Sequence, residues 1–120
     1  MRHYKYGDFA DMQISDVINY LRKRIFFLLL YAEDLESKTN FPNVNLKQAN
    51  TSLLWRISGL NSLLGEPKEL VTVLSLLEEA NNTITENFDF AKYRKLILDA
   101  GAEIIKIAPS IDEQSAKIAL

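Results

Sequence analysis

The chain has 120 residues, of which 48% are hydrophobic and 25% charged, a composition ordinary for one soluble globular domain. The net charge of −2 excludes a bulk attraction to polyanions, and the lack of cysteine excludes a disulfide framework and a thiolate metal site. The Met1 end shows no basic segment followed by an apolar stretch and a cleavage site, so we expect a cytoplasmic protein.

Residues 1–13 are predicted to form an extended N-terminal arm, because aromatic and polar residues alternate there. A long helix is expected to follow, from a cap at Ser15 to about Ser37. Its uncharged run from Ile25 to Ala32 is far shorter than the ~20 residues that cross a bilayer, which predicts a core segment. An apolar seam at helical spacing comprises Ile14, Val17 or Ile18, Leu21, Ile25, Leu28 or Leu29, Ala32 and Leu35.

A second stripe on this helix consists of Tyr20, Arg24, Phe27 and Tyr31. With both stripes, the helix is apolar over most of its circumference, so neighbours must cover it on several sides. One interpretation is that the N-terminal arm or the C-terminal segment of the same chain covers this second stripe. The other is a surface for a partner protein or for self-association, because aromatic residues and arginine anchor protein interfaces.

A second helix is expected after the break at residues 40–45, with Asn45 as its cap and an apolar seam that ends at Leu64. Gly65 is predicted to take the left-handed conformation that ends the helix. Trp55 lies off the seam on a face with small residues. It is interpreted as a core-boundary residue, with an exposed interaction residue as the alternative.

Pro67 is predicted to start a third helix that runs to about Ala80. The connection at Gly65 is very short, which makes the second and third helices antiparallel neighbours.

A fourth helix is predicted to begin at a cap formed by Asn87 or Asp89 and to end at Pro109. Gly101 lies in its middle, where glycine costs about 1 kcal/mol relative to alanine, so we expect another backbone to approach closely there. Residues 109–120 are predicted to form a short C-terminal helix with a weak apolar stripe.

Residues with catalytic or ligating chemistry are few. The single histidine, His3, lies near the terminus, and a general base needs a fixed position. No Glu-x-x-His pair is present for a di-iron site in a bundle, and the four glycines are too scattered for a phosphate-binding loop. We therefore expect no enzyme, cofactor, metal or small-molecule substrate.

Acidic residues are interpreted as parts of solvated surfaces. Asp99 and Glu103 share a helix face with Lys95 and Lys106 at steps of three and four, which predicts an exposed charge ladder. The acidic pair at 33–34 is interpreted as a solvated helix end.

Two basic groups support a nucleic-acid-binding alternative. Three consecutive helical residues fan out over about 200°, so the first triplet cannot present all its charges to one groove. Nucleic acid is therefore not the expected partner. The residues concerned are Arg22, Lys23, Arg24, Lys92, Arg94 and Lys95.

These patterns together predict one domain over residues 1–120, an all-α antiparallel four-helix bundle with a long hydrophobic first helix. In size and expected architecture it is similar to bacteriocin immunity proteins and to small helical proteins of phages and mobile elements. That similarity covers shape only and implies no site residues. The expected function is non-enzymatic: a regulator, inhibitor, immunity-type factor or complex subunit that binds another protein or forms a homodimer.

Overall fold

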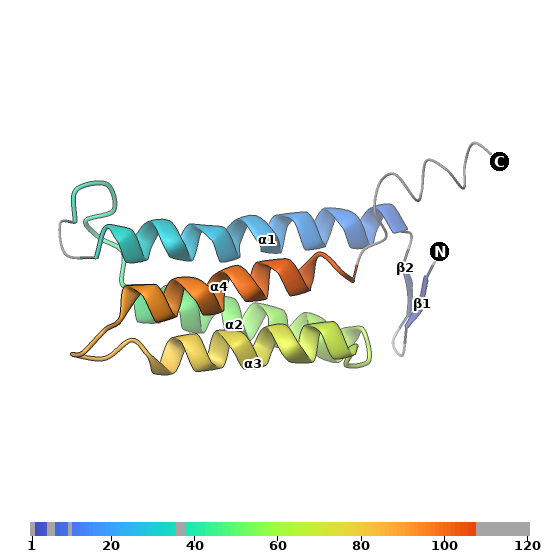
Figure 1. The fold of residues 1–120 in the computed structure, drawn as a ribbon. Coiled ribbons are helices and arrows are strands. Elements are labelled where there is room, and N and C mark those ends of the chain that lie inside the picture. The colour runs from blue at the N-terminus through green and yellow to red at the C-terminus, as the bar shows by residue number, and fades with distance from the viewer. Residues whose placement is uncertain (1, 5–6, 10, 36–37, 108–120) are drawn as a thin grey trace.

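The computed structural model describes residues 2–4, 7–9, 11–35 and 38–107. Within these ranges the body of the chain is all-helical, as predicted, and is compatible with a helical bundle (Figure 1). α1 lies beside α2 and α4, and α3 also lies beside α2 and α4, so the helices surround one core. Their bounds are Asp11–Glu33 for α1, Leu46–Leu63 for α2, Lys68–Asn82 for α3 and Phe90–Ile104 for α4.

The predicted extended arm is instead a short hairpin followed by the first turn of α1. Strands β1, Arg2–Tyr4, and β2, Gly7–Phe9, pair antiparallel with Arg2 opposite Phe9. The predicted C-terminal helix at 109–120 lies outside the described residues.

The start predicted for the first helix was wrong. α1 begins at Asp11, so Ser15 lies inside the helix and is buried. An acidic residue is favourable in the first turn of a helix, and methionine and glutamine have good helix propensity, so the sequence at 11–13 allows the helix to begin before Ser15.

Helix caps and the turn glycine follow the sequence closely. The side chain of Asn45 accepts a hydrogen bond from Gln48 N at 3.0 Å, and that of Asp89 accepts one from Lys92 N at 3.2 Å. Gly65 has a φ of 80°, the left-handed conformation expected after α2. Pro67 is the cap residue of α3 rather than its first helical residue.

The core contains most of the residues that the apolar seams predicted, whereas Leu35 at the end of the α1 seam is only partly buried. The second position of the α1 seam was predicted to be Val17 or Ile18. Ile18 is the buried residue, and Val17 is exposed. The prediction that the uncharged run is a core segment is confirmed for four of its residues, and no helix in the described ranges is long and apolar enough to cross a membrane. The fully buried large side chains are Ile18, Ile25, Leu28, Asn50, Ile57, Leu70, Val73, Leu77, Tyr93, Ile97 and Ile104.

The close approach predicted at Gly101 is absent. A Cβ atom built on this residue would meet nothing within 4 Å, and the same holds for Gly59 in α2. Alanine restricts the unfolded chain more than glycine and fits both helical positions. Gly101→Ala is therefore expected to raise the free energy of unfolding by about 1 kcal/mol in urea denaturation. A lower stability would show that another backbone needs this space, and Gly59→Ala is the matched comparison.

Candidate protein-interaction surface

The second stripe of α1 lies largely in solvent. Tyr20 is 51% exposed, Phe27 is 39% exposed and Arg24 is exposed as well, whereas Tyr31 is partly buried. We call these four residues, together with Trp55 of α2, the aromatic face. Among the residues that the structure describes, internal cover therefore reaches only the Tyr31 end of the stripe.

Tyr31 is covered by a segment that the sequence analysis did not name. Its ring stacks on Phe27 at a centroid distance of 6.1 Å and meets the edge of Phe41 at 4.9 Å. Phe41 belongs to the connection between α1 and α2. This connection closes the Tyr31 end of the stripe. The C-terminal segment, the other predicted cover, lies outside the described residues.

Asp34 holds that connection in place. Its carboxylate accepts hydrogen bonds from the backbone N–H groups of Thr39 at 3.1 Å, Asn40 at 3.0 Å and Phe41 at 2.7 Å. The side chain is buried, so the interpretation of this residue as part of a solvated helix end was wrong. A carboxylate can accept several backbone hydrogen bonds at once, and here they fix the chain that carries Phe41.

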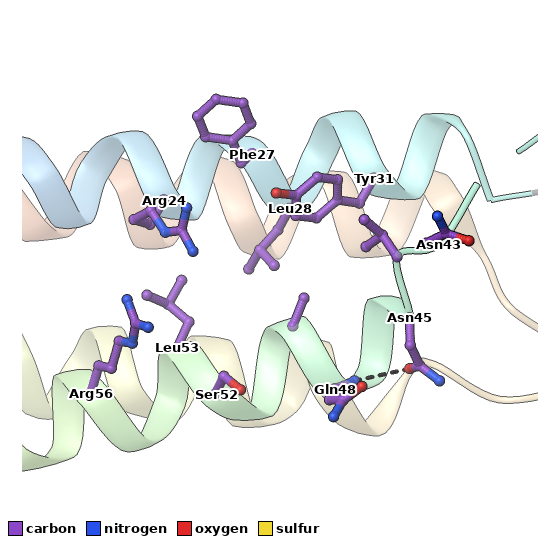
Figure 2. Close-up of a pocket in the computed structure, with 12 residues that line it drawn as sticks. Arg24, Phe27, Leu28, Tyr31, Asn43, Asn45, Gln48, Ser52, Leu53 and Arg56 are labelled. Carbon is purple, nitrogen blue, oxygen red and sulfur yellow. Dashed lines mark hydrogen bonds between the residues drawn. The ribbon is translucent and has the colours of Figure 1, made fainter. Parts of the chain in front are cut away.

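A cleft of about 320 Å³ separates α1 from α2 (Figure 2). The side chains of Leu28 and Leu53 point into the space between the helices, whereas Phe27 points away from it. Arg24 and Arg56 approach each other from opposite helices, and Arg56 Nη1 donates a hydrogen bond to Tyr20 Oη at 3.0 Å. The cleft is lined by Arg24, Phe27, Leu28, Tyr31, Asn43, Val44, Asn45, Gln48, Ala49, Ser52, Leu53 and Arg56.

Trp55 is the most exposed large hydrophobic side chain in the described ranges, at 77%. Its surroundings include Asn45, Gln48 and Ser52, which also line the cleft, so Trp55 and the α1 stripe lie on one continuous surface. The core-boundary interpretation was wrong. The small residues on this side of α2 are not matched by a packed neighbour, as Gly59 shows.

A second apolar surface lies between α1 and α4, and sequence reasoning missed it. Its exposed apolar residues include Phe26, at 56%, Leu98 and Ile105, and Phe27 lies at its border with the aromatic face. They line a groove of about 840 Å³ whose wall includes Gly101. One sequence feature could have indicated this surface: Phe26 is a large apolar residue that belongs to neither the core seam nor the second stripe of α1.

The structure divides the first basic triplet between two surfaces. Arg24 lines the cleft toward α2, whereas Arg22 and Lys23 line the groove toward α4, where their neighbours run from Ile97 to Ile105. The second basic group, Lys92, Arg94 and Lys95, lies in the first half of α4 and does not line that groove. The nucleic-acid alternative stays a prediction.

The charge ladder on α4 is confirmed. Lys95 lies 3.7 Å from Asp99, and Lys106 Nζ donates to Glu103 at 2.9 Å, in both cases at the surface. Nowhere in the described ranges do three histidine, cysteine or acidic side chains gather as metal ligands would.

A buried polar network joins three helices. Tyr93 Oη donates to Asn50 Oδ1 at 2.9 Å, and Asn50 Nδ2 donates to the backbone carbonyl of Leu77 at 3.1 Å. Burial raises the pKa of the Tyr93 hydroxyl, so this group stays a hydrogen-bond donor at neutral pH. The sequence did not indicate the role of Asn50 in this network.

Comparison of the chain with protein-family models, with curated proteins and with solved structures finds no match.

Proposed function

We propose that this chain is a small, non-enzymatic protein-interaction module. In this proposal an antiparallel four-helix bundle with a long first helix presents the aromatic face to another protein or to a second copy of itself. The proposed class is a cytoplasmic regulator, inhibitor, immunity-type factor or complex subunit, including one encoded by a phage or mobile element. The exposure of Trp55 is the observation that carries the proposal.

The exposed aromatic side chains of the aromatic face can contribute binding energy because they lie on one surface. Aromatic side chains bury about 150–250 Å² each, and apolar area is worth about 25 cal/mol per Å² when it leaves water. Single exposed hydrophobic residues are normal on a protein surface. Here, however, Phe27 lines a cleft with Arg24 and Arg56, and Tyr20 accepts a hydrogen bond from Arg56. Trp55 shares the neighbours Asn45, Gln48 and Ser52 with that cleft. Tryptophan, tyrosine and arginine dominate binding energy in interfaces.

Site-specific photo-crosslinking in the native host tests the proposal. A photoreactive phenylalanine analogue is placed at position 55, and the control variant carries it at Val71, another exposed hydrophobic residue, on α3. We expect a defined product from position 55 and none from position 71. A product of twice the chain's mass identifies a homodimer, and another defined mass identifies a partner. Equal products at both positions, or none at position 55, would argue against the aromatic face.

The Trp55→Ala variant should separate binding from folding. Because the side chain is exposed, we expect the free energy of unfolding to change by less than about 0.5 kcal/mol. Loss of an anchoring tryptophan at an interface costs about 2 kcal/mol or more, roughly a thirtyfold loss of affinity. The measurement is the affinity for the crosslinked partner, or the dimer dissociation constant, with Val71→Ala as the control. An unchanged affinity would remove Trp55 from the interface.

A further inference from the structure

The cleft between α1 and α2 contains two positive charges and no negative one. Its lining includes Arg24 and Arg56 but no aspartate or glutamate. Neither arginine forms an ion pair with a carboxylate in the described ranges, and Arg56 is held by the neutral hydroxyl of Tyr20. Figure 2 shows the two guanidinium groups directed toward each other across the cleft.

Both arginines are exposed to solvent, so an anion can reach their guanidinium groups. Two positive groups that face each other repel, whereas an anion between them attracts both. Guanidinium groups bind phosphate and carboxylate oxygens through paired N–H donors, which makes arginine the preferred residue for such sites. We propose that this cleft binds a dianionic phosphoryl group between Arg24 and Arg56.

The remaining lining residues fit the same ligand. The Tyr31 hydroxyl points toward the Arg24 end of the cleft, and Ser52 and Gln48 add polar side chains from α2 (Figure 2). A phosphate monoester carries about −1.5 to −2 charges at pH 7, which matches two arginines better than a single carboxylate does. Sites for small molecules begin at about 300 Å³, and the cleft of about 320 Å³ has Leu28 and Leu53 to contact an organic group.

The inference needs no partner protein, so its test is separate from that of the proposed function. Inorganic phosphate and phenyl phosphate are titrated into the purified protein at constant ionic strength and followed by NMR shifts of the arginine side-chain N–H groups. We expect saturable shifts at Arg24 and Arg56, tighter binding of phenyl phosphate than of inorganic phosphate, and weaker binding of acetate. A phosphotyrosine peptide that binds more tightly than phenyl phosphate would support the same site, with a protein as the carrier.

Charge-matched variants decide whether the site is specific. Arg24→Gln and Arg56→Gln should each weaken phosphate binding about tenfold or more. Arg22→Gln is the control, because it removes the same charge from the same helix but lines the other groove. The phosphate affinity of the Arg22→Gln variant should stay within about twofold of that of the parent chain. The proposal is overturned if no saturable shift occurs, or if all three variants lose affinity equally, which would indicate only a general charge effect.

Discussion

Replacing Asn50 with alanine is expected to lower the free energy of unfolding by about 3 kcal/mol. The substitution leaves the buried Tyr93 hydroxyl without its acceptor and removes the donor that reaches the Leu77 carbonyl. An unpaired buried polar group costs about 1–3 kcal/mol, and the lost side-chain volume adds a cavity cost. Urea denaturation followed by circular dichroism measures this change.

A double-mutant cycle with Tyr93→Phe isolates the hydrogen bond between the two side chains. Tyr93→Phe alone leaves Asn50 Oδ1 unpaired and should cost about 1–3 kcal/mol. Once Asn50 is alanine, loss of the hydroxyl no longer leaves an acceptor unpaired, so Tyr93→Phe should cost much less in that background. We expect a coupling energy of about 1 kcal/mol or more. Strictly additive effects would show that the two side chains act independently.

Asp34→Ala is expected to destabilise the fold by about 2–3 kcal/mol. It removes the acceptor of three backbone hydrogen bonds, at Thr39, Asn40 and Phe41, and hydrogen bonds to charged groups are worth about 1.5–3 kcal/mol. Their values do not add fully, because one loop closure supports all three. The measurement is again the free energy of unfolding in urea.

Two controls separate hydrogen bonding at Asp34 from charge. Asp34→Asn keeps an oxygen for Thr39 and Asn40 but replaces the oxygen that accepts from Phe41, so it should cost less than alanine. Glu33→Ala removes a neighbouring exposed charge and should change stability by less than about 0.5 kcal/mol. A loss at Glu33 as large as that at Asp34 would contradict the anchoring role. Release of Phe41 should also raise the exposure of Tyr31, because the two rings are in contact.

Local sequence signals predicted the features that depend on neighbouring residues. The caps at Asn45 and Asp89 and the left-handed Gly65 each follow from side-chain or backbone chemistry within one turn of a helix. The apolar seams predicted most of the core because helical spacing fixes which residues share a face. The start of α1 was missed because several residues before Ser15 are also suited to a helix.

Features that depend on contacts distant in the sequence were not predictable in the same way. Asn50 is polar and lies near the start of α2, and only its partners on α3 and α4 explain its burial. Periodicity placed Trp55 off the core seam but could not show whether another element covers it. The placement of Arg24 and Arg56 at one cleft likewise depends on how α1 packs against α2.

Fluorescence of Trp55 measures the state of the aromatic face most directly, because it is the only tryptophan in the chain. In dilute protein we expect the emission of a water-exposed indole and efficient quenching by iodide. Binding of the crosslinked partner, or a rise in chain concentration if the partner is a second copy, should shift emission to shorter wavelength and reduce quenching. A dilute monomer whose indole already emits at short wavelength and resists iodide would show that Trp55 is not exposed. Partner binding that leaves both signals unchanged would show that the aromatic face is not the binding surface.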